Sequence, residues 1–222
     1  PMDLPHLRHG LSAGEKLSAP VRAAWTAATG TPIFEAYGMS ECSTFISAAP
    51  QAPAEGGALG RIQPGRRVSL RAKGAEVAQG NAGTIAVHRS DPGLMLGYLN
   101  DPAQTAARFD GDWFLTGDIA QQDAAGQITY LGRDDDMMNA GGFRVSPLEV
   151  ESALADFDGI TAIGAAEVEV KPGVRVIAAF YTSACALDED ALHLYASAKL
   201  ARYKQPRLYV HLPQLPSGAN GK

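Results

Sequence analysis

Residues 37–41, Tyr-Gly-Met-Ser-Glu, place an aromatic ring, a hydroxyl and a carboxylate within five positions. Such a set could stack on a nucleotide base, bind a phosphate and hold Mg²⁺. Residues 32–36 read as a buried strand, and a short helix can begin after them, which is where α/β folds bind ligands. The alternative is a core Tyr37, a turn at Gly38, and Ser40 capping a helix with Glu41 near its dipole. The five residues alone leave both interpretations open.

A second stretch with possible chemistry spans residues 132–151. It contains a Gly-Arg pair, three consecutive acids at 134–136, a glycine pair at 141–142 and Arg144. Residues 146–149 then predict a helix start, with Ser146 as cap, Pro147 in the first turn and Glu149 as capping-box partner. One interpretation is a mobile charged joint that also handles a polyphosphate. The other is an acidic surface turn before a helix.

Two further polar residues stand at the ends of recognisable segments. Asp118 closes the sequence Trp-Phe-Leu-Thr-Gly-Asp at 113–118, and a carboxylate there can accept two hydroxyl protons in charge-assisted hydrogen bonds. The alternative for Asp118 is a turn residue after Gly117. Lys222 ends the glycine-rich segment 215–222, where the alternative is a solvated tail.

The elements that must position these residues fall into three segments. Residues 1–48 read as α/β, with a strand at 7–11, a loop at 12–15, a helix capped by Ser18 that ends at Gly30, and the strand at 32–36. Residues 55–131 read as a small distorted barrel of antiparallel strands at 68–70, 84–87, 113–115 and 128–131. Within it, Asp101 caps a short helix over 101–109, and residues 123–126 form a hairpin turn.

The third segment, residues 134–222, reads as a small α+β domain. After the helix capped by Ser146, strands are predicted at 160–170 and 174–181, an amphipathic helix at 188–200 and a last strand at 208–212.

Composition narrows the class of protein. The 222 residues are 45% hydrophobic, which is ample for packed cores, and the net charge of −5 argues against nucleic acid or an anionic membrane as the main partner. The two cysteines, far apart in sequence, fit a reducing cytosol, so we expect a cytoplasmic protein. No apolar run approaches the ~20 residues that span a bilayer. The first residue is Pro1 and the last are Gly-Lys, so both ends look cut from a longer chain.

These motifs, in this order, resemble those of the adenylate-forming superfamily: acyl- and aryl-CoA synthetases, luciferases and peptide-synthetase adenylation domains. Residues 37–41 resemble its Y-G-x-T-E motif, with Ser40 in place of the usual Thr, and residues 113–118 resemble its W-x-x-T-G-D. Residues 132–136, 142–144 and 149–151 resemble G-R-x-D-D, G-x-R and E-V-E. The segment ending at Lys222 resembles P-x-x-x-x-G-K, although the residues in its middle differ from the commonest ones.

The resemblance implies an architecture. Residues 1–132 would be the C-terminal part of a large AMP-binding domain, with an α/β piece at 1–50 and a β-barrel piece at 55–131. Residues 133–222 would be a mobile C-terminal domain with its hinge at 133–136 and its pivot at Asp135.

The resemblance also implies roles for residues. Ala13, Gly14 and Glu15 would face adenine, Tyr37 with Gly38 and Met39 would pack on it, and Asp118 with Arg133 would bind the ribose. Ser40 would meet the phosphates, Glu41 would bind Mg²⁺, Arg144 would meet a phosphate, and Gly142 would line a tunnel for the pantetheine arm of coenzyme A. Lys222 would stabilise charge on the α-phosphate of ATP.

The activity implied is that of an ATP-dependent acyl- or aryl-acid:CoA ligase, which uses ATP to form an acyl-adenylate and then forms a thioester with coenzyme A, releasing AMP. Its partners would be a small carboxylic acid, ATP and CoA, with no nucleic acid and no membrane span, and a homo-oligomer is left open. One alternative is an adenylation module that loads a carrier protein. Another is a fragment that is inert alone, because the family's Thr/Gly-rich phosphate loop is not found in the chain.

Overall fold

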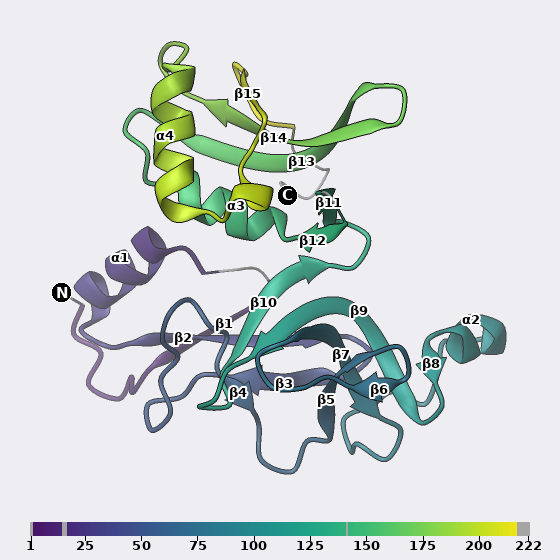
Figure 1. The fold of residues 1–222 in the computed structure, drawn as a ribbon. Coiled ribbons are helices and arrows are strands. Elements are labelled where there is room, and N and C mark those ends of the chain that lie inside the picture. The colour runs from purple at the N-terminus through teal and green to yellow at the C-terminus, as the bar shows by residue number, and fades with distance from the viewer. Residues whose placement is uncertain (1, 15–16, 141, 217–222) are drawn as a thin grey trace. The chain divides into compact units, whose positions relative to one another are not determined.

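The computed structural model describes residues 2–14, 17–140 and 142–216, and the chain divides into two compact units, Pro1–Tyr130 and Leu131–Lys222. The sequence places this boundary after residue 132, whereas the first unit ends at Tyr130. The assignment of the units to enzyme domains stays a prediction. Figure 1 labels the elements of both units.

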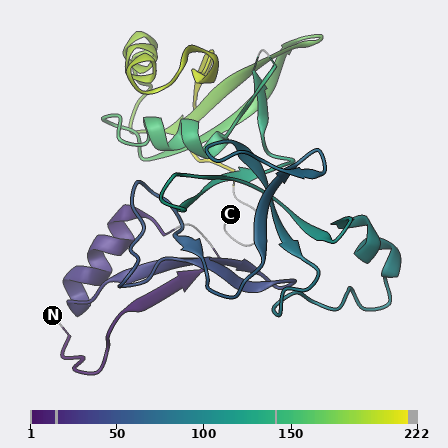
Figure 2. The same cartoon turned by 60° about the horizontal axis from the view of Figure 1, so that its bottom comes forward.

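The first unit begins with a four-stranded sheet in the order β1-β2-β3-β4. Its strands are β1 (Gly10–Ala13), β2 (Ile33–Met39), β3 (Ser43–Ser47) and β4 (Arg61–Ile62), with β1 parallel to β2 and the other pairs antiparallel. Helix α1 (Ala19–Thr29) lies along one face of this sheet (Figures 1 and 2). The Arg22 guanidinium on α1 donates to the carbonyl of Ile33 at 3.0 Å and to the Glu35 carboxylate at 2.8 Å.

Local signals placed α1 correctly. Ser18 accepts a hydrogen bond from the backbone N–H of Val21, and Gly30 ends the helix in the left-handed conformation, φ 70°. Two expectations here were wrong. The first strand is β1, so Ala13 lies in a strand where a loop was expected, because pairing with β2 extends it. No helix follows Tyr37: β2 runs through Met39 and turns into β3, because that pairing satisfies the backbone that a helix would otherwise use.

The rest of the first unit is a six-stranded antiparallel sheet with α2 (Pro102–Ala107) beside it. The order β10-β9-β7-β5-β6, with β8 on β9, is linear, and the sheet is visibly curled (Figure 1). In the described residues no pairing joins the two edges, so it is a curled sheet where a barrel was expected. Its strands are β5 (Val68–Ala72), β6 (Ala75–Glu76), β7 (Ala82–His88), β8 (Phe109–Asp110), β9 (Trp113–Gln122) and β10 (Ile128–Arg133).

One apolar core joins both sheets of the first unit. Its fully buried members include Phe45 and Ile46 from β3, Ile85 and Val87 from β7, and Phe114 from β9. Because these side chains pack together, the β2–β3 turn and the middle of β9 are fixed relative to one another.

In its described residues, the second unit contains a hairpin, two helices, one 3₁₀ turn and a three-stranded sheet. Its elements are β11 (Met138–Ala140), β12 (Phe143–Val145), α3 (Pro147–Leu154), β13 (Ala162–Lys171), β14 (Val174–Thr182), α4 (Glu189–Lys199), η1 (Arg202–Lys204) and β15 (Leu208–His211). The sheet order is β13-β14-β15, with β15 parallel to β14. The two helices and three strands were all predicted: the bounds of β13, β14, α4 and β15 agree to within about two residues, and for α3 only the start was predicted.

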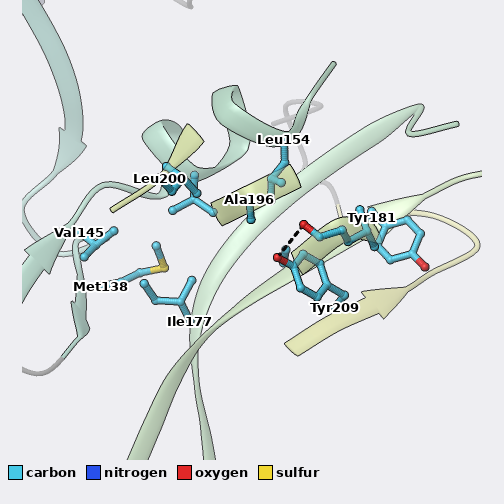
Figure 3. Close-up of a cluster of buried hydrophobic side chains, with 11 residues drawn as sticks. Met138, Val145, Leu154, Ile177, Tyr181, Ala196, Leu200 and Tyr209 are labelled. Atoms are coloured by element: carbon cyan, nitrogen blue, oxygen red, sulfur yellow. Dashed lines mark hydrogen bonds between the residues drawn. The ribbon is translucent and has the colours of Figure 1, made fainter. Parts of the chain in front are cut away.

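The core of the second unit lies between its sheet and its helices. Figure 3 shows Leu154 of α3 and Ala196 of α4 converging on Tyr181 and Tyr209 of the sheet. The Tyr209 hydroxyl donates to the Leu192 carbonyl at 3.4 Å.

The start of α3 is only partly as predicted. Ser146 caps it by accepting from the N–H of Glu149 at 3.2 Å. The Glu149 carboxylate does not complete a capping box, because it instead accepts from the Lys204 ammonium at 2.5 and 2.7 Å. A full positive charge attracts a carboxylate more strongly than a neutral backbone N–H does.

The predicted fold class is confirmed: an α/β piece, then the piece expected as a small distorted β-barrel, which is a curled sheet, and then a small α+β unit. None of the helices in the described residues has the length and apolarity that crossing a membrane requires.

Candidate functional site

Tyr37 and Asp118 lie 81 positions apart in the sequence and meet in the first unit. The Tyr37 hydroxyl donates to Oδ2 of Asp118, and the Tyr130 hydroxyl donates to Oδ1 at 3.2 Å. Burial raises the pKa of Tyr37, and the negative charge of Asp118 raises it further, so the hydroxyl remains a donor. Two motifs that the sequence singled out separately therefore form one cluster.

A bulge in β9 positions Asp118. Leu115 pairs with Ala86 and Ile119 pairs with Thr84, so residues 116–118 all stand opposite Ile85. Gly117 adopts φ 81°, in the left-handed region that favours glycine. The buried Thr116 hydroxyl donates to the Ile85 carbonyl at 2.8 Å and accepts from the Asp118 N–H at 3.1 Å. In the Thr-Gly-Asp sequence, Thr and Gly thus shape the bulge that presents the carboxylate.

The carboxyl end of β1 lies beside Tyr37. Ala13 pairs with Ala36 in the parallel register, and the exposed Gly14 follows with φ 94°, where an added Cβ would meet no described residue within 4 Å. Glu15 lies outside the described residues. Among the described residues, the backbone at Gly14 is therefore open beside Tyr37.

The β2–β3 turn carries Ser40 and Glu41. A register shift at Tyr37/Gly38 bends β2, and the Cys42 N–H donates to the Met39 carbonyl at 3.0 Å. Ser40 is exposed and Glu41 is half-buried. Oε1 of Glu41 accepts a hydrogen bond from the Tyr98 hydroxyl at 2.8 Å, and the backbone carbonyl of Glu41 accepts one from the Met95 N–H at 2.6 Å.

Glu41 suits Mg²⁺ better than a metal that needs a full protein cage. Mg²⁺ keeps several waters and uses one or two carboxylates together with substrate phosphates. In the described residues no three His, Cys, Asp or Glu side chains gather into a metal site. Oε2 of Glu41 accepts no hydrogen bond within the part of the chain that the structure describes. A half-buried glutamate next to an exposed serine in the sequence fits a metal bound with phosphates.

The predicted residues of the second unit lie around one short segment. Arg133 contacts the Asp135 carboxylate at 3.4 Å, and Arg144 donates to Oδ1 of Asp134 at 2.6 Å and to its carbonyl oxygen. Asp135 is 76% exposed in a turn closed by the Asp136 N–H on the Arg133 carbonyl. Gly142 precedes β12 with φ 87° and open space at its Cβ position. Lys222 lies outside the described residues.

Sequence reasoning missed Tyr98, Tyr130 and the pair formed by Arg66 and Asp91. Tyr130 lies within β10, so it looked like an ordinary strand residue. Tyr98 lies in an irregular loop after Gly97. The sequence offered only a single aromatic residue outside any periodic pattern, which does not indicate a functional role. Asp91 is a buried acid among turn residues, which only its partners explain.

Comparisons with known proteins agree with this arrangement. A family profile described as AMP-binding enzyme matches residues 1–99. Benzoate–CoA ligase from Thauera aromatica is 35% identical over 224 residues, which cover 97% of this chain and 42% of that protein. A mitochondrial acyl-coenzyme A synthetase of Mus musculus is 33% identical over 229 residues, covering 97% of this chain and 39% of that protein.

Solved structures are similar over nearly the whole chain. The anthranilate CoA ligase in complex with anthranoyl-AMP has a TM-score of 0.82 at 30% identity, covering 99% of this chain and 43% of that one. The o-succinylbenzoate coenzyme A synthetase from Bacillus subtilis, in complex with ATP and magnesium, has a TM-score of 0.82 at 28% identity, covering 97% and 45%. The chain spans less than half the length of each of these relatives. Together, the profile, the identities and the structural similarity show that this chain belongs to the adenylate-forming superfamily, as a part that resembles its acyl- and aryl-CoA ligases.

Proposed function

We propose that the chain is part of an ATP-dependent acyl- or aryl-acid:CoA ligase. The observation that carries this proposal is the meeting of Tyr37 with Asp118 beside the carboxyl end of β1, where residues 13–14 lie. The relatives named above, which are CoA ligases, support the same activity.

In this proposal, Asp118 binds the ribose. Each carboxylate oxygen has two lone pairs, so Asp118 can accept from ribose hydroxyls while it holds the hydroxyls of Tyr37 and Tyr130. Those two tyrosines fix the carboxylate before the nucleotide arrives. The Tyr37 ring, with Gly38 and Met39, lies along the adenine, and residues 13–15 face it.

Ser40 and Glu41 act on the polyphosphate. Ser40 donates its exposed hydroxyl to a phosphate oxygen, and Glu41 is the protein ligand of Mg²⁺. When bound, Mg²⁺ supplies positive charge that draws negative charge away from the phosphates. The two side chains hold the α-phosphorus in line for attack by the carboxylate of the acid substrate.

The activation step makes the later thiol attack possible. A carboxylate does not acylate a thiol because its leaving group would be an oxide. Attack of the carboxylate oxygen on the α-phosphorus forms an acyl-adenylate and releases pyrophosphate, and AMP then leaves when the thiol attacks the carbonyl carbon. Charge builds on the α-phosphate oxygens in the first step, where the Lys222 ammonium is proposed to stabilise it.

The second unit is proposed to serve the thiol step. Asp135 is the pivot, Gly142 lets a pantetheine arm pass close to the backbone, Arg144 meets a phosphate and Arg133 assists at the ribose. Coenzyme A is the proposed acceptor, because the similar proteins named above are CoA ligases. Cytoplasmic location remains part of the proposal and rests on the sparse, unpaired cysteines.

The experiment uses the full-length protein that contains this chain. ATP–pyrophosphate exchange is measured across a panel of aromatic and aliphatic acids, and CoA consumption is followed for every acid that supports exchange. Exchange together with thioester formation supports the ligase. Exchange with no use of CoA favours a carrier-protein acceptor, and no exchange with any acid contradicts the proposal. We expect the 222 residues alone to show no exchange, since they span less than half of the relatives.

A further inference from the structure

The loop of residues 91–98, Asp-Pro-Gly-Leu-Met-Leu-Gly-Tyr, holds the segment of residues 40–44, here called the Glu41 turn. Three contacts connect them: Asp91 acts through Arg66, Met95 contacts the Glu41 carbonyl, and Tyr98 contacts the Glu41 carboxylate. The loop contains no helix or strand. These polar contacts therefore hold the loop against the Glu41 turn, as backbone pairing holds two neighbouring strands together.

Arg66 fixes the backbone of the turn. Its guanidinium donates to the carbonyls of Cys42 and Thr44, both at 2.6 Å, and pairs with Asp91 at 3.0 Å. The Asp91 side chain is fully buried. Burial alone would raise the pKa of Asp91, but hydrogen bonds from the Arg67 and Gly93 N–H groups and from Arg66 hold that pKa below its usual value. Asp91 therefore remains charged and anchors Arg66.

Tyr98 fixes the carboxylate. Its N–H donates to the Thr105 hydroxyl of α2 at 2.9 Å, and that hydroxyl donates to the Asp101 carbonyl at 2.9 Å, so the backbone of Tyr98 is held by a capped helix. Its own hydroxyl donates to Oε1 of Glu41 at 2.8 Å.

We propose that Tyr98 is a positioning residue for Glu41. The Tyr98 hydroxyl holds Oε1 of Glu41, so that Oε2 is directed to the divalent cation that accompanies the nucleotide. This rests on the proposed function. Tyr98 touches neither substrate nor cation. A glutamate side chain has three rotatable bonds, and its carboxylate loses much of that freedom when one oxygen is held in advance. Partners that orient a metal ligand typically change metal affinity by 10–100-fold.

The test is Tyr98→Phe in the full-length protein, because this change removes one oxygen and no ring atom. The first readout is binding of Mn²⁺, followed by electron paramagnetic resonance with a non-hydrolysable ATP analogue present. We expect the Kd of Mn²⁺ to rise about tenfold. The second is the Mg²⁺ dependence of ATP–pyrophosphate exchange, where the half-saturating Mg²⁺ concentration rises by a similar factor and the rate at saturating Mg²⁺ changes little.

Tyr209→Phe is the matched control, because it removes a hydroxyl that donates to a protein oxygen in the second unit. It should leave Mn²⁺ binding unchanged. Metal-free AMP binding and thioester formation from synthetic acyl-adenylate should also be unchanged in Tyr98→Phe.

Two outcomes overturn the proposal: equal Mn²⁺ affinity in Tyr98→Phe and the wild type, or a parallel loss of metal-free AMP binding, which indicates a structural role. A wild type without pyrophosphate exchange contradicts the proposed ligase instead, and the Mn²⁺ measurement still decides the role of Tyr98.

Discussion

Replacing Gly38 with alanine tests whether the β2–β3 turn has the close backbone approach that the structure shows. A Cβ added at Gly38 would lie 2.3 Å from the Ser43 carbonyl oxygen and 2.6 Å from the Thr44 Cα. Carbon atoms pack best at about 3.5–4.0 Å, so the Ser43–Thr44 backbone would have to move by roughly 1 Å. No flexible side chain can absorb this displacement.

The expected cost follows from what must move. Overpacking of this kind destabilises by about 1–3 kcal/mol. The displaced backbone also carries the Thr44 carbonyl that accepts from Arg66, and weakening such a bond adds about 1 kcal/mol. We therefore expect Gly38→Ala to lower the stability of the first unit by about 2–4 kcal/mol and to weaken nucleotide binding, since Glu41 lies in the same turn.

Urea unfolding of the 222-residue chain provides the assay. Both tryptophans, Trp25 and Trp113, lie in the first unit, so their fluorescence reports on that unit. With a slope of about 2 kcal/mol per molar urea, the midpoint should fall by roughly 1–2 M.

Gly164→Ala in β13 is the control for this experiment, because among the described residues its added Cβ would meet only Leu215, at 4.0 Å. Followed by circular dichroism, its stability should change by less than about 0.5 kcal/mol. If the unfolding curve of Gly38→Ala coincides with that of the wild type, the close approach of β2 and β3 is wrong.

Three further predictions concern the full-length protein. Asp118→Asn replaces a charged acceptor by a neutral one, which at about 1 kcal/mol for each of two ribose bonds predicts a roughly 30-fold higher Kd for AMP by calorimetry; an unchanged Kd contradicts the ribose role. Asp135→Pro fixes φ near about −65°, so adenylation and thioester formation should respond differently, whereas equal loss of both indicates misfolding and not a hinge. Lys222→Ala should slow adenylation by about 10²–10³ and spare thioester formation from synthetic acyl-adenylate; parallel effects on both reactions, or none, leave Lys222 a solvated tail.

Elements whose ends are set by adjacent residues were predictable from the sequence. Ser18, Asp101, Ser146 and Asp188 each cap a helix by accepting from an N–H three positions along the chain, so the cap and the apolar pattern locate each helix together. The motifs were also found, since each is a short run of distinctive residue types.

Features that depend on distant partners were not predictable. Nothing in residues 37–41 shows that β2 continues through Met39, because the strand is completed by pairing with β3 and by the bulge at Gly38. From the sequence, Thr116 was only one position of the Thr-Gly-Asp motif. Its role in supporting the bulge is seen only from its hydrogen bond to the Ile85 carbonyl. The Glu149 side chain left its expected cap because Lys204 comes from 55 positions away.

The two supports of the Glu41 turn differ in what they hold. Arg66 and Asp91 form a buried pair, with side chains 11% and 0% exposed, and removing either would leave a charge in the core at a cost of about 3–5 kcal/mol. A substitution there would therefore disturb the fold of the first unit before it reported on the site. Tyr98 contributes one hydroxyl to a half-buried carboxylate, and its loss leaves no buried charge. Changes to the backbone of the turn would therefore lower the stability of the first unit. The direction of the Glu41 carboxylate depends instead on one oxygen atom, that of the Tyr98 hydroxyl. Because the two effects are separate, Tyr98→Phe tests metal positioning while the fold stays intact.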